Sequence, residues 1–240
     1  MRNRVFFSLL FVAASVIAAP MRVALTFDDG FADHYELAAP ALESFKLHAT
    51  FNLVTDWIGT EKFMSWDQVR DLVRRGHDLA SHTASHPNLA QLIDAGKTNE
   101  VSRQVSASRE TIEREVGKAV PGFRVAQLCH PYVANNAAVE AEIRKAGLQP
   151  MTLDRWNFGN LGKGDVSYRG RWMTTAEFLD TMIAEGRTDV DILCHGVRRE
   201  VGWEPFSTVE DFRRHLATIA RYRDEGRIVV VSERQLNPHR

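Results

Sequence analysis

Residues 22–30, RVALTFDDG, decide the fold. The first five are apolar except for the terminal arginine and threonine, which is typical of a strand buried on both faces. The last three are two adjacent carboxylates and a glycine, and glycine lets the backbone turn sharply as it leaves the strand. Strands of this kind belong to parallel sheets covered by helices, so the segment predicts βα units.

The rest of the chain repeats the alternation of strand and helix, without an internal repeat or a linker rich in proline and glycine. Further strands are predicted at residues 49–53, 78–80, 125–129, 189–194 and 228–231. Capping boxes at Ser65 with Gln68 and at Thr174 with Glu177 predict helices that reach Arg75 and about residue 184. Helices are also expected over about 99–117, about 136–146, and from about residue 33.

This alternation predicts a single α/β domain built as a closed or nearly closed parallel (β/α) barrel, in which chemistry occurs where the strands end. The chain has 240 residues, of which 44% are hydrophobic and 25% charged, and this composition excludes disorder and a multi-span membrane protein. Thirty basic against 31 acidic residues, a formal net charge of -1, argue against nucleic acid as the partner.

The first eighteen residues have the layout of a secretory signal peptide. Two arginines precede an apolar run from Val5 to Ile17, which is followed by small residues. Cleavage is expected after Ala18, with cleavage after Ala19, an uncleaved anchor and a start at Met21 as alternatives. The run is too short for a membrane span, so we expect a periplasmic or secreted protein with no stable membrane insertion once the signal is removed.

Asp28 and Asp29 emerge at the end of the first strand. Adjacent side chains on an extended segment point apart, so one carboxylate could hold a cation while the other faces a substrate. The alternative is a helix N-cap, a position that favours aspartate.

A second cluster, His82 and His86, follows the short strand at 78–80. On one helical turn a four-residue spacing brings both imidazoles to one face, as in zinc-binding helices. Such a pair is often only a solvated helix face. Together with an aspartate from another strand end, two histidines suit Zn²⁺ or another first-row metal in an open, catalytic site.

Two more strand ends carry titratable groups: residues 129–132 (CHPY) and 193–195 (LCH). His195 follows a very apolar stretch, so it is either a core histidine bonded to a carbonyl oxygen or a general acid. An ordinary histidine pKa of about 6.5 suits proton donation near neutral pH.

In these motifs and their order the chain resembles the polysaccharide deacetylases of the NodB-homology type, a carbohydrate esterase family. TFDDG at 26–30 is similar to the family's first motif, HTASH at 82–86 to its second, HPY at 130–132 to its third and LCH at 193–195 to its last. The resemblance spans about residues 23–231. It implies a distorted parallel (β/α) barrel of about seven strands with an open seam, and a catalytic domain over residues 19–240.

The resemblance also implies a role for each matching residue. Asp28 would be the general base and His195 the general acid. Asp29, His82 and His86 would bind one divalent metal ion, with Zn as the first choice and Co, Ni, Mn or Fe as alternatives.

The substrate would be bound by Pro131 and Tyr132, with a backbone N–H near Tyr132 helping to hold the oxyanion. Asp154 and Trp156 resemble the fourth motif, which lines the acetyl pocket, although Trp156 could equally be a core aromatic.

The chain departs from the family at Cys129, where an arginine usually pairs with the catalytic base. A buried carboxylate without a partner would become protonated, so another cation or donor is predicted beside Asp28. The candidates are Arg171, which would then belong to the binding site, then Arg169, then His130. The alternative for both arginines is a solvated loop.

The function expected from these residues is metal-dependent removal of acetyl groups from N-acetylhexosamine units of an extracytoplasmic oligo- or polysaccharide. One alternative is O-deacetylation of a plant polysaccharide such as acetylated xylan. Another, motivated by the missing arginine, is a non-catalytic carbohydrate-binding relative.

Overall fold

The computed structural model describes residues 19–132, 136–151, 154–159, 164–198, 200, 206 and 208–236. The expected signal peptide, residues 1–18, lies outside this part of the chain. Within it, no helix is both long and apolar enough to cross a membrane.

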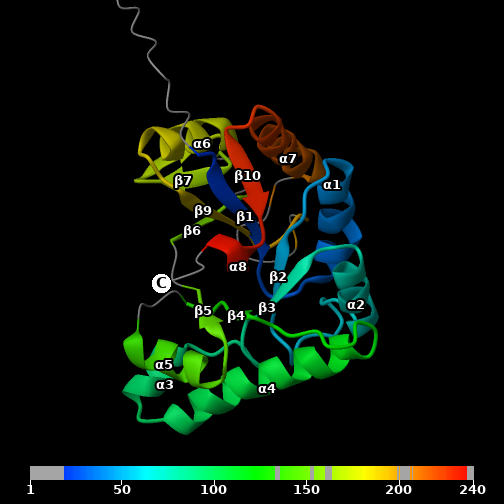
Figure 1. Ribbon diagram of the computed structural model, residues 1–240, viewed down its shortest axis with the longest axis vertical. Helices are drawn as coiled ribbons and strands as arrows, with labels where there is room; N and C mark the ends of the chain where they lie inside the picture. Colours follow the sequence, from blue (N-terminus) through cyan, green and yellow to red (C-terminus); the bar gives the residue numbers. More distant parts are fainter. Residues whose placement is uncertain are drawn as a thin grey trace, which may run out of the picture.

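One curled sheet of parallel strands forms the centre of the described chain (Figure 1). Its path is β5-β4-β3-β2-β1-β9-β6, and β10 pairs with the first half of β1. No pairing joins the end strands β5 and β6 in the described residues, which leaves an open seam. The strands are β1 Met21–Phe27, β2 Thr50–Leu53, β3 Asp78–Ser81, β4 Gln127–Leu128, β5 Gln149–Pro150, β6 Arg155–Asn157, β9 Asp189–Cys194 and β10 Ile228–Val231. The predicted single-domain barrel of about seven strands with an open seam is confirmed.

The helices surround the sheet, and Figure 1 shows α4 running along one side of it. Both predicted capping boxes are present: Ser65 opens α2 and Thr174 opens α6. The helical elements are the π-helical turn η1 His34–Ala38, α1 Ala39–Ser44, α2 Trp66–Arg74, α3 Leu89–Asp94, α4 Thr98–Gly117, α5 Ala137–Lys145, α6 Thr175–Ala184, α7 Val209–Asp224 and α8 Glu233–Leu236.

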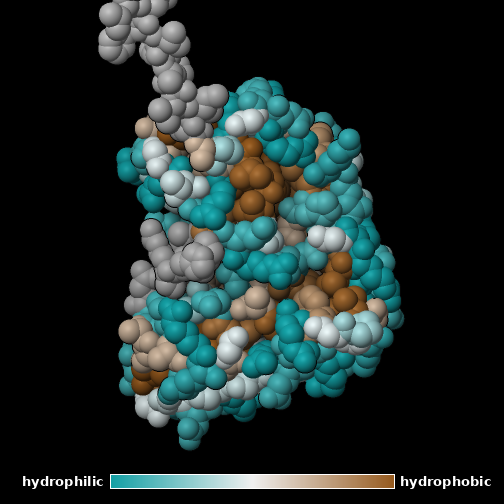
Figure 2. Space-filling view, in the orientation of Figure 1, coloured by the Kyte–Doolittle hydropathy of each residue, from teal (hydrophilic) through white to brown (hydrophobic). Residues whose placement is uncertain are grey.

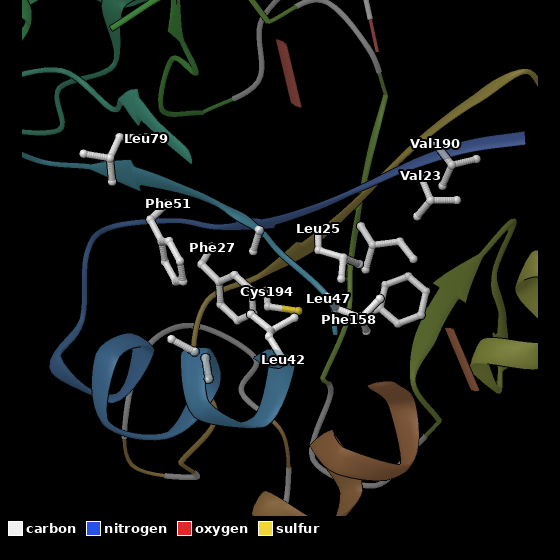
Figure 3. Close-up of a cluster of buried hydrophobic side chains, with 14 of the residues drawn as sticks. Val23, Leu25, Phe27, Leu42, Leu47, Phe51, Leu79, Phe158, Val190 and Cys194 are labelled. Carbon is white, nitrogen blue, oxygen red and sulfur yellow. The ribbon is translucent and has the colours of Figure 1, made fainter. Parts of the chain in front are cut away.

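Alternation along the strands separates an apolar outer layer from a polar interior. Phe27 of β1 and Phe51 of β2 pack beside Leu42 of α1 in the hydrophobic core (Figure 3). Their neighbours Asp28 and Asn52 are also buried but bond to each other instead. Because successive side chains point to opposite faces, this pattern directs carboxylates and amides of several strands into the barrel.

The outer face seen in Figure 2 is largely hydrophilic, with hydrophobic residues gathered over β1 and β10 and between β2, β3 and α2. Val229 of β10 is a large hydrophobic residue that is 38% exposed.

Several features were not predicted. They include the helices α3, α7 and α8. Strands β5 and β6 have two and three residues, too few for periodicity to reveal. The hairpin of β7 Val166–Tyr168 and β8 Arg171–Met173 is antiparallel and separate from the main sheet. The helix expected from about residue 33 begins as a π-helical turn, and such turns occur frequently at functional sites.

Candidate active site

A cavity of about 520 Å³ opens where strands β1, β3 and β9 end. The carboxyl ends of parallel strands meet at one rim, which is why motifs far apart in the sequence converge there. The residues that line it are Asp28, Asp29, His82, His86, His130, Tyr132, Arg155, Leu193 and His195.

Asp29, His82 and His86 form a compact cluster of three ligand-type groups. Asp29 Oδ1 lies 3.4 Å from His86 Nε2 and 3.7 Å from His82 Nε2. One donor atom of each residue lies within 4.8 Å of the other two.

Left-handed backbone conformations give this cluster its shape. Asp29 has φ 81° and His86 has φ 63°, values that are uncommon for non-glycine residues and that often occur at functional sites. Gly30 has φ 88°, a conformation that residues with a side chain rarely adopt, and a Cβ there would lie 2.7 Å from Ile58 Cδ1, so the end of that side chain would have to shift. The histidine pair therefore sits on a tight loop and not on the helical turn that its spacing suggested.

Neighbouring groups orient both imidazoles. His82 Nδ1 lies 2.6 Å from the carbonyl oxygen of Cys129, so this nitrogen donates its hydrogen and Nε2 presents a lone pair to the cluster. The His86 ring stacks on Trp57 with 5.2 Å between ring centroids. Its backbone N–H donates to Thr83 Oγ1.

These residues fit a divalent metal ion. Buried Asp29 Oδ1 has no hydrogen-bond partner among the described residues, which is costly unless a cation or water satisfies it. Burial and the nearby Asp28 raise the pKa of Asp29 to about 7, and burial lowers the pKa of His82 to about 4. One carboxylate and two neutral imidazoles are the donors of an open, three-ligand site.

A second combination, Asp28 with His82 and Cys129, also meets the distance requirement. It fits a cation less well for two reasons. Both oxygens of Asp28 already accept hydrogen bonds from Arg155, and burial raises the pKa of the Cys129 thiol, which disfavours the thiolate.

Asp28 is held by an arginine that the sequence analysis did not identify. Arg155 Nη1 donates to Asp28 Oδ2 and Nη2 donates to Asp28 Oδ1, both at 2.8 Å, and Asn52 Nδ2 donates to Oδ1 at 2.6 Å. Burial alone would raise the pKa of Asp28, but the charge and hydrogen bonds of Arg155, together with the nearby His82 and His195, outweigh burial and hold the pKa well below its usual range. The carboxylate is therefore ionised although it is only 3% exposed.

The predicted cation beside Asp28 thus exists, but its identity was wrong. Arg171 is exposed on β8, and Arg169 pairs with Glu185 at 2.8 Å. His130 lines the cavity but makes no hydrogen bond or ion pair with Asp28 in the described part of the chain. None of these three takes the position that Arg155 occupies.

The residues predicted for the fourth motif are displaced by one position along β6 from the residues that face the site. The prediction chose Asp154 and Trp156, whereas alternation along β6 directs Arg155 and Asn157 into the site. Asp154 is exposed, and Trp156 packs against Phe178 of α6 with ring centroids 5.5 Å apart. These contacts agree with the alternative interpretation of Trp156 as a packing aromatic.

His195 lies at the rim of the same cavity. Its Nδ1 is 2.8 Å from Asn157 Oδ1, and because an amide oxygen only accepts, Nδ1 carries the hydrogen. Burial lowers the pKa of His195 to about 4.

The third motif forms the other wall of the cavity. Tyr132 is 59% exposed with φ 56°, and its ring lies 5.2 Å from that of His86. Pro131 is buried between His130 and Tyr132 and is not part of the lining itself.

Comparison with known proteins relates this arrangement to one family. A family model described as polysaccharide deacetylase matches residues 17–151. A peptidoglycan-N-acetylglucosamine deacetylase of Bacillus cereus is 36% identical over 148 residues, which cover 60% of this chain and 47% of that protein. A chitin deacetylase of Colletotrichum lindemuthianum is 26% identical over 185 residues, covering 75% and 69% of the two chains.

Solved structures share the fold. An acetyl xylan esterase of Clostridium thermocellum, crystallised with a cobalt ion, matches with a TM-score of 0.62 at 18% identity, over 90% of this chain and 89% of that one. The matches to the first three curated relatives cover 29%, 47% and 24% of their lengths, so this chain spans less than half of each.

Proposed function

The chain belongs to the polysaccharide deacetylase family, and from that premise we propose that it removes acetyl groups from N-acetylhexosamine units of an extracytoplasmic glycan. The observation that carries the proposal is the shared cavity. It combines an ionised carboxylate, Asp28, with the cluster of Asp29, His82 and His86 and with the imidazole of His195.

The cluster of Asp29, His82 and His86 would hold one divalent ion, for which Zn²⁺ is our first proposal. A bound ion of this kind lowers the pKa of water and polarises a carbonyl group. Asp28 would accept the proton of the attacking water, because Arg155 and Asn52 keep its carboxylate ionised and fixed in orientation.

His195 would donate a proton to the departing amine. Its Nδ1 is engaged by Asn157, so the donated proton would leave from Nε2. With a pKa of about 4 the free imidazole is neutral at pH 7, and the acid role therefore requires proton uptake once the substrate is bound. The backbone N–H of Tyr132 would hydrogen-bond the developing oxyanion.

The glycan specificity and the export of the protein are parts of the same proposal. Relatives are described as acting on peptidoglycan and chitin, which lie outside the cytoplasm. The proposed signal over residues 1–18 agrees with such a substrate, and residues 19–240 would then be the mature catalytic domain.

An acetate-release assay tests the proposal directly. Chitooligosaccharides, peptidoglycan, poly-N-acetylglucosamine and acetylated xylan are incubated with the protein, either with added Zn²⁺ or with chelator. We expect release from an N-acetylated glycan that the chelator abolishes. Release from acetylated xylan alone would replace amide hydrolysis with ester hydrolysis, and release from none would favour a non-catalytic binding protein.

Two variants connect any activity to this cavity. Asp28→Asn and His195→Ala should each lower turnover by about 10²- to 10⁴-fold, the usual effect of losing a general base or acid. Metal content should stay at the wild-type level, because neither residue belongs to the cluster. A folded variant with near-normal turnover would remove that residue from the mechanism.

A further inference from the structure

The segment that follows β1 is hydrogen-bonded to the segment that carries His195. Asp33 Oδ2 accepts hydrogen bonds from the backbone N–H groups of Val197 at 2.7 Å and Arg198 at 3.0 Å. His34 Nε2 lies 2.9 Å from the carbonyl oxygen of His195. Residues 33 and 34 are therefore joined to residues 195–198 by three hydrogen bonds to the main chain.

The bond from His34 has a defined direction. A carbonyl oxygen only accepts, so His34 Nε2 carries the hydrogen and donates it. The ring is fully buried, and its Nδ1 has no partner among the described residues. Burial lowers the pKa of His34, so the imidazole is a neutral donor.

Packing holds this donor in place. The His34 ring lies edge-on to Phe27 and Phe31, with centroid distances of 5.3 and 5.7 Å, and 5.8 Å from Phe51. An apolar site of this kind would suit a phenylalanine equally well. A histidine that is buried there, with one nitrogen left unpaired, is a cost that packing alone does not explain.

We propose that Asp33 and His34 are positioning residues that fix the backbone of His195, so that its imidazole reaches the leaving group. The inference rests on the proposed function, in which His195 is the general acid. Asn157 fixes the ring of His195 through Nδ1, while His34 and Asp33 fix the main chain that carries it. Both anchors are needed, because a displacement of about 1 Å at a reacting group can lower a rate about 10²-fold.

A pair of His34 variants separates the hydrogen bond from the packing. His34→Phe keeps the ring shape among the three phenylalanines and removes the donor. His34→Gln places an amide N–H near the former Nε2 and can restore it. We expect kcat for deacetylation of a chitooligosaccharide, or of the substrate that the panel identifies, to fall about 10- to 100-fold in His34→Phe and to recover largely in His34→Gln.

Comparing substrates with different leaving groups distinguishes a positioning role from general structural damage, because only one of the two leaving groups needs a proton. A 4-nitrophenolate leaves without being protonated, so hydrolysis of 4-nitrophenyl acetate does not depend on a general acid. His34→Phe should therefore change this rate by less than about twofold while the rate on the acetamide falls. An equal loss on both substrates would mean general damage to the site and would overturn the inference.

His215→Phe is the matched control. His215 is also a buried histidine among phenylalanines, and Thr175 is its one side-chain hydrogen-bond partner in the described part of the chain, but it does not line the cavity. This variant should leave the ratio of the two rates unchanged.

A double-mutant cycle tests whether His34 acts through His195. In a His195→Ala background, His34→Phe should have less than about a twofold further effect, because the group that it positions is gone. Independent, multiplicative losses would overturn the inference.

Asp33→Asn extends the test if His34→Phe does not fold. It keeps the side-chain size but loses the charge that strengthens both hydrogen bonds, so we expect the same pattern with a smaller loss. Wild-type activity with no loss in this variant would refute only the positioning role of Asp33 and His34. A wild-type protein that releases no acetate from any substrate would refute the proposed function instead.

Discussion

Arg155 reaches Asp28 from β6, which lies at one end of the sheet path, whereas Cys129 follows β4 near the other end. Its Nη1 lies 2.6 Å from Cys129 Sγ, and its Nε donates to Asp191 at 2.9 Å. A thiol is much smaller than a guanidinium, so the cysteine leaves the space that Arg155 fills. In this chain β6 therefore supplies the positive charge that the resemblance would place at position 129.

Replacing Arg155 should move the proposed base toward its protonated form. In Arg155→Met the charge and hydrogen bonds of Arg155 no longer lower the pKa of Asp28, while burial, the largest influence, still raises it, so the pKa rises. The acidic limb of the kcat/KM profile should consequently move to higher pH and turnover at pH 7 should fall. Removing one partner of a buried ion pair should also cost on the order of 3–5 kcal/mol of stability.

Two further variants serve as controls for this measurement. Arg171→Met makes the same chemical change at an exposed residue and should leave the pH profile unchanged. The double variant Arg155→Met/Cys129→Arg returns the charge to the third motif and should recover part of the turnover. An Arg155→Met enzyme with a wild-type profile would contradict the role given to this arginine.

The proposed metal ligands can be tested directly. Replacing Asp29, His82 and His86 together by alanine should abolish the binding of one Zn²⁺ per chain, measured by elemental analysis. Because the pKa of metal-free Asp29 is about 7, a proton competes with the ion below that pH, and calorimetry should detect proton release on binding at pH 6. Wild-type metal content in the triple variant would show that these are not the ligands.

At the scale of elements, β6 shows what the sequence could and could not specify. The strands β1 and β9 and the helices with capping boxes were predictable, because each has four or more residues with a clear pattern. The motifs at their ends were then brought together by the parallel topology. β6 has only three residues, and a shift of one residue exchanges its inward and outward side chains.

Substitutions on the two faces of β6 should therefore have different effects. Asn157→Ala removes the partner of His195 Nδ1 and should lower turnover on acetamides without much loss of stability. Trp156→Ala removes packing against Tyr168 and Phe178 and should lower the Tm, while kcat of the folded enzyme stays near the wild-type value. Thermal unfolding and acetate release measure the two effects. A loss of turnover in Trp156→Ala with none in Asn157→Ala would show that Trp156 belongs to the site.

At the scale of the whole molecule, the fold buries several histidines in their neutral form. Burial lowers the pKa of His77, His82, His195 and His215 to about 4 each. In the unfolded chain these histidines are protonated near pH 6.5, whereas in the fold they stay neutral down to about pH 4. The four histidines therefore make the folded state less stable as the pH falls. The raised pKa of Asp29 acts in the opposite direction, because there the folded state holds the extra proton.

His215 isolates one of these contributions, because it lies away from the cavity and can be compared before and after substitution. Its pKa is about 4 in the folded protein and about 6.5 in the unfolded chain, so its stabilising contribution is fully present above pH 6.5 and is lost as the pH falls toward 4. His215→Phe loses the bond to Thr175 and should be less stable than the wild type at pH 7. The difference in unfolding free energy should then shift in favour of the variant on acidification, by up to about 3 kcal/mol at pH 4. Urea unfolding of both proteins with chelator present, at several pH values, measures this difference while common effects of other groups cancel. A difference that stays constant from pH 7 to pH 4 would show that His215 is not held neutral by burial.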